Sequence, residues 1–228
     1  MAVDWLKATD YAHRGLHGLG AACPENSLAA VEESIGQDFG IEVDVQRSAD
    51  YEAVAFHDAT LNRMTDRIGP VANFPAAMLG AIALQGTAQA IPTLNQVLGL
   101  VNGRVPLLVE IKSVPGMPGV FEQRIATLLE SYRGPIAVMS MSPTPLAWLG
   151  ILAPRVPLGD VVTNVHRSSI LRQLLRGATT LVRAAGGGAM ARGDFAAVER
   201  ILLGHDSLDG VRERGQPLLA WTIRSEQE

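Results

Sequence analysis

Short apolar segments alternate with segments of helical periodicity along the chain, and this alternation constrains the fold more than any other feature. Strands are expected at 11–15, 41–48, 52–58, 106–113, 135–141, 157–162 and 217–224, with one more near 181–186 or 200–206. Helices are expected at 25–37, 92–103, 120–132, 144–152 and 168–177. Repeated strand–helix units predict an α/β fold with a parallel sheet, either a barrel or an open doubly wound sheet.

Composition narrows the classes of partner. The 228 residues, 47% of them hydrophobic, suffice for one large domain or two small ones. The net charge of −4, from 23 acids and 19 bases, gives no general basic field, so no nucleic-acid partner is expected. Cys23 is the only cysteine, which excludes an intrachain disulfide.

The sequence shows no sign of a membrane segment. No uninterrupted apolar stretch approaches the roughly 18–20 residues that a membrane-spanning helix requires. The first residues also lack the basic-then-apolar pattern of a signal peptide. These features predict a cytoplasmic protein without an integral membrane segment.

Acidic residues interrupt two of the apolar strand candidates. In the run IEVDV, Glu42 and Asp44 point to one face of a strand, and the apolar residues point to the other. The run PLLVEIKS repeats this arrangement with Glu110 and Lys112. Buried charges are costly unless they pair with each other or bind a metal, so these positions require a partner.

Two explanations fit these charges. Three carboxylates at the ends of barrel strands would bind a hard divalent cation, Mg²⁺ or Ca²⁺, through oxygen ligands. The alternative is an ion pair between Lys112 and a glutamate, with the remaining acids in solvent. The same pattern on two strands favours the metal site, with Glu42, Asp44 and Glu110 as its ligands.

Two histidines end strand candidates. His13 precedes Arg14, and His57 precedes Asp58. A single histidine is more often structural, but two beside an acidic cluster suit a general acid and a general base on opposite sides of a reacting centre. Arg14 and Lys112 supply the fixed positive charge that a phosphate needs. Together these residues predict phosphoester chemistry.

The ordered motifs resemble those of glycerophosphodiester phosphodiesterases. They are HRG (13–15), PENS (24–27), IEVDV (41–45), FHDATLNRMT (56–65), IPTL (91–94), VEIK (109–112) and AWT (220–222). The likeness is strong over about residues 11–112 and loose from there to Trp221. Each motif alone is weak, but the ordered set is specific.

The resemblance implies a (β/α)8 TIM barrel of the phospholipase-C-like phosphodiesterase type. Residues 1–228 would form one domain, with a small insertion after the second strand at about 59–91. We expect the last strand and helix of such a barrel to be missing, because the sequence stops four residues after segment 217–224.

The resemblance also implies an activity: metal-dependent hydrolysis of glycerophosphodiesters, such as glycerophosphocholine, to sn-glycerol 3-phosphate and an alcohol. The partner would be this small-molecule substrate, and the oligomeric state is not predicted. By similarity, His13 would be the general base and His57 the general acid. Arg14 and Lys112 would contact the phosphate. Trp221 is a candidate to line the pocket, with an equal case for a core position.

Alternatives to this function stay open. A phospholipase-D-like relative with the same barrel would cyclise lipid headgroups, but it would want an apolar rim that the sequence does not clearly show. A catalytically silent barrel could bind a ligand without turnover, although the intact set of acids and histidines argues against it. A metal-dependent aldolase or lyase would not need paired histidines beside Arg14.

Two local features carry further expectations. Asp50-Tyr51 stands where the family tends to have Asp-Gly, so the hairpin turn is expected to be less tight. Glu25 and Asn26 are expected to help start the first helix, although the family keeps them near the site.

Overall fold

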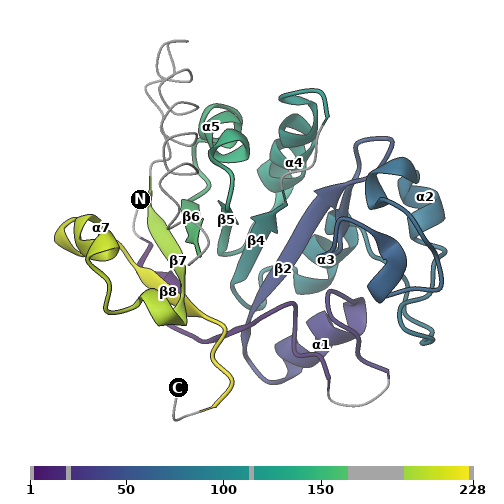
Figure 1. The fold of residues 1–228 in the computed structure, drawn as a ribbon, viewed down its shortest axis with the longest axis horizontal. Coiled ribbons are helices and arrows are strands. Elements are labelled where there is room, and N and C mark those ends of the chain that lie inside the picture. The colour runs from purple at the N-terminus through teal and green to yellow at the C-terminus, as the bar shows by residue number, and fades with distance from the viewer. Residues whose placement is uncertain (1–2, 19–21, 113–115, 164–192, 226–228) are drawn as a thin grey trace.

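The computed structural model describes residues 3–18, 22–112, 116–163 and 193–225 (Figure 1). The strands of this part are β1 (Tyr11–Ala12), β2 (Gly40–Arg47), β3 (Ala53–Ala55), β4 (Leu107–Ile111), β5 (Ile136–Ser140), β6 (Leu158–Val162), β7 (Phe195–Glu199) and β8 (Leu218–Trp221). The α-helices are α1 (Leu28–Gly36), α2 (Ala76–Leu79), α3 (Leu94–Val101), α4 (Val120–Ser131), α5 (Pro143–Leu152) and α7 (Asp209–Glu213). The 3-10 helices are η1 (Asp4–Lys7), η2 (Leu61–Arg63), η3 (Val71–Asn73), η5 (Arg200–Leu202) and η6 (Asp206–Leu208).

The strands form one curled sheet with the order β1-β2-β4-β5-β6-β7-β8, and all neighbours along this path run parallel. Strand β3 pairs with β2 in the antiparallel direction. Because the order never reverses, the sheet is not doubly wound. Among the described residues no ladder joins β1 to β8, so the sheet is an incomplete TIM barrel. The predicted barrel type is therefore confirmed.

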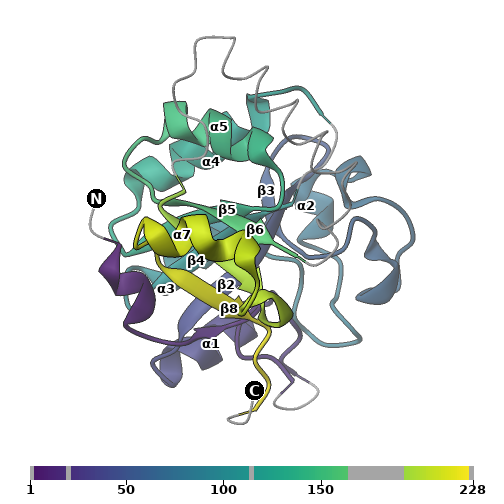
Figure 2. The same ribbon diagram turned by 60° about the vertical axis from the view of Figure 1, so that its left-hand side comes forward.

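Helices cover the outer face of the sheet (Figures 1 and 2). The alternate apolar residues Ile41, Val43 and Val45 of β2 face this layer and are fully buried. Helix α3 begins at a capping box, in which Thr93 accepts a hydrogen bond from the Gln96 backbone. Its apolar stripe then packs into the same core as the outer face of β2. The alternation of apolar and acidic residues in β2 therefore places the apolar side chains in this core and the acidic ones on the inner face.

The inner face of the sheet is apolar where η1 packs against it. Leu6 of η1 is completely buried in a cluster with Leu108, Met139 and Phe195. Leu108 and Glu110 lie on the same face of β4, so this cluster borders the charged residues of β2 and β4. Sequence periodicity did not predict η1, because a four-residue 3-10 helix leaves no periodic pattern.

The predicted insertion at 59–91 contains η2, η3 and α2. It has its own apolar cluster, whose fully buried members include Leu61, Val71 and Leu79. The insertion begins a few residues after β3, and the Gln46 side chain of β2 donates to the backbone oxygen of Asp58 just before it. That residues 1–228 form a single domain stays a prediction.

One of the two positions considered for the remaining strand is wrong. Segment 200–206 is not a strand: it contains η5 and begins η6, and Ile201 in it is exposed. Strand β7 was not predicted, because in its sequence FAAVE two alanines of low β-propensity stand between Phe195 and Val198 and weaken the strand pattern. Segments 168–177 and 181–186 lie outside the described residues. No helix in the described ranges is both long enough and apolar enough to span a bilayer.

Candidate active site

Three carboxylates meet inside the curled sheet, where β2 and β4 run side by side. Asp44 is the direct ladder partner of Glu110, and Glu42 precedes Asp44 by one pleat on the same face. One oxygen of each carboxylate lies within 4.8 Å of the others. The exposed fractions are 4% for Glu42, 0% for Asp44 and 8% for Glu110. The acids that the sequence pattern selected thus form one buried cluster.

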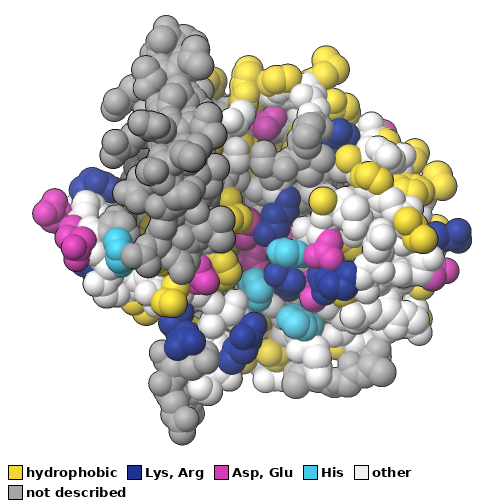
Figure 3. All heavy atoms as spheres, in the orientation of Figure 1, with side chains coloured by type: hydrophobic (Ala, Val, Ile, Leu, Met, Phe, Trp, Pro, Cys, Tyr) yellow, Lys and Arg dark blue, Asp and Glu magenta, His cyan; other side chains and the backbone are white. Residues whose placement is uncertain are grey.

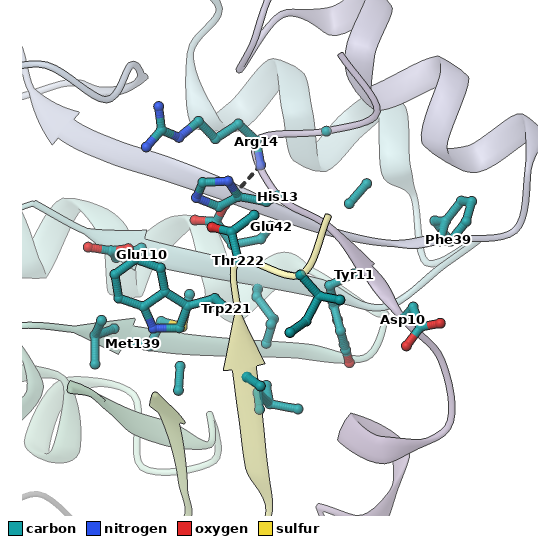
Figure 4. Close-up of a pocket in the computed structure, with 18 of the residues that line it drawn as sticks. Asp10, Tyr11, His13, Arg14, Phe39, Glu42, Glu110, Met139, Trp221 and Thr222 are labelled. Carbon is teal, nitrogen blue, oxygen red and sulfur yellow. Dashed lines mark hydrogen bonds between the residues drawn. The ribbon is translucent and has the colours of Figure 1, made fainter. Parts of the chain in front are cut away.

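Two cations contact this cluster. The Lys112 Nζ atom lies 2.8 Å from Asp44 Oδ1 and 2.6 Å from Glu110 Oε1. The Arg14 backbone N–H donates to Glu42 Oε2 at 2.9 Å (Figure 4), and its side-chain Nε lies 3.2 Å from Asp44 Oδ2. Burial acts to raise the pKa of Asp44, but the charges of Lys112 and His57 and the hydrogen bonds from Lys112 and Asn26 together outweigh it, and the net shift is downward.

Glu42 is the member that these cations leave incompletely satisfied. Its Oε1 atom is buried and has no hydrogen-bond partner. Burial first, and the charges of Asp44 and Glu110 second, raise the pKa of Glu42 well above its usual value. A divalent cation would stabilise the ionised form of this carboxyl, and three carboxylates are the hard oxygen donors that such a cation prefers. The cluster therefore fits a divalent metal site.

Both predicted histidines lie beside the acids. His13 follows β1, and burial first and the charge of Arg14 second lower its pKa to about 4. His57 follows β3, and its Nδ1 atom lies 2.7 Å from Asp58 Oδ1. Because a carboxylate only accepts hydrogen bonds, Nδ1 carries the proton, and Nε2 is the atom left free to exchange one.

A cavity of about 800 Å³ connects these groups. Seven of the eight predicted site residues line it: His13, Arg14, Glu42, His57, Glu110, Lys112 and Trp221. Figure 4 shows His13, Glu42, Glu110 and Trp221 around the same space. The eighth residue, Asp44, is completely buried behind Arg14 and Lys112. In Figure 3, basic, acidic and histidine side chains gather in one patch on this face of the molecule.

The remaining wall of the cavity is mainly apolar. It includes Leu6, Tyr11 and Leu108, and from the later strands Met139 of β5, Val161 of β6, Ala197 of β7 and Leu219 of β8. Trp221 is partly buried, packs against the apolar cluster of Leu6 and also lines the cavity. Trp221 thus borders both the cavity and this apolar cluster, and its contact with substrate stays a prediction.

Asn26 contacts the acidic cluster, although sequence reasoning placed it near the site only through the family resemblance and gave it no role there. Its Nδ2 donates to Asp44 Oδ2 at 2.9 Å, and its Oδ1 accepts from the Asp44 backbone N–H at 3.0 Å. The expectation that Glu25 and Asn26 help start the first helix is wrong, because Ser27 caps α1 by accepting from the Ala30 backbone N–H. Asn26 instead has a left-handed backbone, with φ 58°, that turns its amide toward β2.

The glycerophosphoryl diester phosphodiesterase family model matches residues 13–228. The chain belongs to this family. A glycerophosphodiester phosphodiesterase of Bacillus altitudinis is 30% identical over 168 residues, which are 68% of this chain and 66% of the relative. A glycerophosphodiester phosphodiesterase of Bacillus subtilis (strain 168) is 25% identical over 240 residues and is matched by 95% of this chain over 77% of its own length.

A solved structure shows the same fold. An Oleispira antarctica phosphodiesterase, in complex with the product sn-glycerol-3-phosphate, superposes with a TM-score of 0.77 at 23% identity. The match covers 98% of this chain and 88% of that one. The family, the fold and the enzyme class predicted from the sequence are confirmed: the chain is a phosphodiesterase of the family that acts on glycerophosphodiesters.

The geometry also bears on the ion-pair alternative. Lys112 does pair with a glutamate, as that alternative proposed, and it pairs with Asp44 as well. The remaining acid, however, is not in solvent: Glu42 is buried with one unpartnered oxygen. The ion pair alone therefore leaves Glu42 unexplained, whereas a metal site accounts for all three carboxylates.

Proposed function

We propose that this family member hydrolyses glycerophosphodiesters to sn-glycerol 3-phosphate and an alcohol, with His13 as general base and His57 as general acid. Glu42, Asp44 and Glu110 hold a divalent cation, Mg²⁺ or Ca²⁺. The observation that carries the proposal is the buried, unpartnered oxygen of Glu42 inside a carboxylate triad that both histidines flank in one cavity.

His13 has the properties of a base. With a pKa lowered to about 4, its imidazole is neutral at pH 7 and accepts a proton from the attacking group. That group is a water molecule or a hydroxyl of the substrate's glycerol. The lowered pKa extends the neutral form well below the usual histidine range, so this base stays competent in mildly acidic solution.

His57 has the orientation of an acid. Its Nδ1–H donates to Asp58, which fixes the ring and leaves Nε2 for the leaving group. When the P–O bond to the alcohol breaks, Nε2–H transfers its proton to the departing oxygen. Without this proton an alkoxide would have to leave, so we expect the acid to matter most for alcohols of low acidity.

Arg14 and Lys112 orient the phosphate. Both line the cavity, and both are held by buried carboxylates, so their side chains need little reorganisation on binding. When bound at the triad, a divalent cation would draw electron density from the phosphoryl oxygens. Trp221 offers an apolar surface to the part of the substrate that carries no charge.

The test is the release of product from glycerophosphocholine, followed by phosphorus NMR. The wild type should form sn-glycerol 3-phosphate, EDTA should abolish the reaction, and His13→Ala should slow it by about a hundredfold or more. Re-addition of Mg²⁺ or Ca²⁺ after EDTA identifies the metal. Full activity in EDTA would disprove the metal site, and full activity of His13→Ala would disprove the base.

The same spectra separate the alternatives. A headgroup-cyclising enzyme would accumulate a cyclic phosphate as its end product, whereas the proposed reaction ends in the monoester. A silent barrel would bind a divalent metal without turning over any glycerophosphodiester. The cytoplasmic location favoured by the sequence stays a prediction, which fractionation of cells that express the protein would test.

A further inference from the structure

Arg63 lies outside the cavity and contacts two carboxylates that hold cavity residues of the proposed site. It ends η2 in the insertion, and its side chain is 45% exposed. Its Nε and Nη2 atoms lie 2.6 and 2.9 Å from the two oxygens of Asp58. Its Nη2 and Nη1 atoms lie 2.6 and 3.1 Å from the two oxygens of Glu25. One guanidinium thus binds two carboxylates in a forked manner.

Each of these carboxylates supports a different residue of the cavity. Asp58 holds Nδ1 of His57 at 2.7 Å, and Glu25 holds Nη1 of Arg14 at 3.0 Å. Arg63, Asp58 and Glu25 do not line the cavity, whereas His57 and Arg14 do. A chain of contacts therefore runs from His57 through Asp58, Arg63 and Glu25 to Arg14.

We infer that Arg63 is a positioning residue that fixes the proton donor His57 through Asp58 and the phosphate-binding Arg14 through Glu25. This inference rests on the proposed function, in which His57 is the general acid. Lysine cannot replace arginine here, because one ammonium group cannot form the forked contacts to two carboxylates.

The charges of the network agree with this role. The hydrogen bond from Arg63 is the largest effect on Asp58, and it lowers the pKa of that carboxyl to about 2. For Glu25, burial acts to raise the pKa, but the hydrogen bonds and charges of Arg63 and Arg14 outweigh it and lower it. Both carboxyls are therefore ionised acceptors, and the fork keeps Asp58 from rotating away from the imidazole.

Two readouts separate the effect of Arg63 on His57 from its effect on Arg14. The first compares two substrates with the same glycerophosphoryl group. Choline leaves as a poorly acidic alcohol and needs a proton, whereas p-nitrophenol leaves as a stable anion and does not. The ratio of kcat for glycerophosphocholine to kcat for glycerophospho-p-nitrophenol therefore reports proton delivery by His57. The affinity for sn-glycerol 3-phosphate, measured by calorimetry, reports the placement of Arg14.

The variants should divide as follows. We expect His57→Ala to lower the kcat ratio by about a hundredfold, and Asp58→Asn and Arg63→Met to lower it by about tenfold each. The double variant of Asp58 and Arg63 should lower it no further than Arg63→Met alone, because both act through one contact. Glu25→Gln should weaken product affinity by about fivefold and leave the ratio unchanged.

Arg63→Met should lower both the kcat ratio and the affinity for sn-glycerol 3-phosphate. A general loss of stability would not produce this pattern. Arg67→Met is the matched control: it removes the same charge from the same insertion, and Arg67 is 64% exposed beside Asp66. Arg63→Lys keeps the charge, is expected to fold if Arg63→Met does not, and should show the same two losses.

The outcomes distinguish this inference from the proposed function. If His57→Ala leaves the kcat ratio unchanged, the general-acid assignment fails. If His57→Ala lowers the ratio but Arg63→Met behaves like Arg67→Met, the assignment holds and the inference is overturned. Wild-type values for Arg63→Lys in both readouts would also overturn it, because the charge without the fork would then suffice.

Discussion

The ammonium nitrogen of Lys112 lies 2.8 Å from Oδ1 of Asp44. This contact joins a cation proposed for the phosphate to a carboxylate proposed for the metal. The same nitrogen lies 2.6 Å from Glu110 Oε1. Lys112 thus contributes positive charge at the position where a divalent cation is expected, so its removal should affect metal binding and substrate binding in opposite directions.

We predict that Lys112→Met binds Mg²⁺ about tenfold more tightly, because a nearby like charge no longer repels the incoming cation. The same variant should lose about a hundredfold in kcat/KM for glycerophosphocholine, since the phosphate loses a fixed partner. Calorimetric titration and steady-state kinetics measure the two effects. Arg67→Met, with the same change in net charge, is the control. Weaker metal binding would instead mean that the ammonium orders the carboxylates.

Glu42 makes the stability of the metal-free protein depend on pH. Its folded-state pKa is raised above the usual 4.5, mainly by burial, so the folded chain binds more protons than the unfolded chain above that pH. The stabilisation is fully present below about pH 4.5 and is lost as the pH rises. We therefore expect Glu42→Gln in EDTA to gain stability relative to the wild type with each step from pH 5 to pH 8.

Comparing the two proteins removes the titrations of groups that Glu42 does not influence. The lowered pKa of His13, about 4 against 6.5, gives the opposite slope in both chains and cancels in the difference. Asp44, whose pKa is lowered from 3.8, titrates below this range. Urea unfolding at each pH measures the effect. A constant difference between the proteins would show that Glu42 ionises normally in the folded state.

Asn26 should affect both the stability of the fold and the affinity for metal, because its hydrogen bonds orient Asp44. Asn26→Gly keeps the left-handed backbone without strain and removes two hydrogen bonds, so we expect a loss of about 2 kcal/mol. Metal affinity should fall by about tenfold, because Asp44 loses the contacts that orient it. Asn26→Asp should lose more, since it places a carboxylate against Asp44 Oδ2. Unchanged metal affinity in Asn26→Gly would limit Asn26 to a structural role.

Tyr51 stands in the hairpin turn at the position where the family tends to have glycine. The turn is left-handed at Tyr51, with φ 60°, so the tyrosine adopts a conformation that favours glycine. Its hydroxyl accepts from the Met117 backbone N–H at 2.9 Å, and its ring lies under the Arg47 guanidinium at 5.1 Å. These contacts hold Met117 against the hairpin and compensate for the backbone strain.

We expect Tyr51→Phe to destabilise the protein by about 0.5–1 kcal/mol, because only the hydrogen bond is lost. Tyr51→Gly should have a net effect near zero, since relief of about 1 kcal/mol of strain offsets the lost contacts. Chemical denaturation of both variants measures this difference. A Tyr51→Gly protein far less stable than Tyr51→Phe would show that the strain is small.

The sequence was sufficient for most of the sheet, because buried strands and amphipathic helices differ in period. It failed at β7, where Ala196 and Ala197 carry little strand signal, and at η1, where Leu6 is buried only through tertiary contacts. Both failures have one cause. The packing that selects these elements comes from residues distant in the chain, and local patterns do not contain it.

The same contrast between local patterns and long-range contacts applies to the site. Glu42, Asp44 and Glu110 were found because a charge in an apolar strand violates the burial pattern. Asn26 and Arg63 were given no role in the site, because polar residues in turns are ordinary and their contacts reach across 18 and 38 positions. Sequence reasoning finds residues that look costly where they stand, and it passes over those whose importance depends on which residue the fold brings near.

All the charged groups of the cavity wall that are proposed to act on the phosphate come from residues 13–112, on or beside β1 to β4, while β5 to β8 contribute Met139, Val161, Ala197, Leu219 and Trp221. The charged groups are thus encoded in the first half of the gene, whereas the second half encodes a large part of the apolar wall. Recombination or mutation in the second half can alter which alcohol group is accommodated while the phosphate machinery stays intact. Libraries confined to these later strands are therefore the place to select new diester preferences.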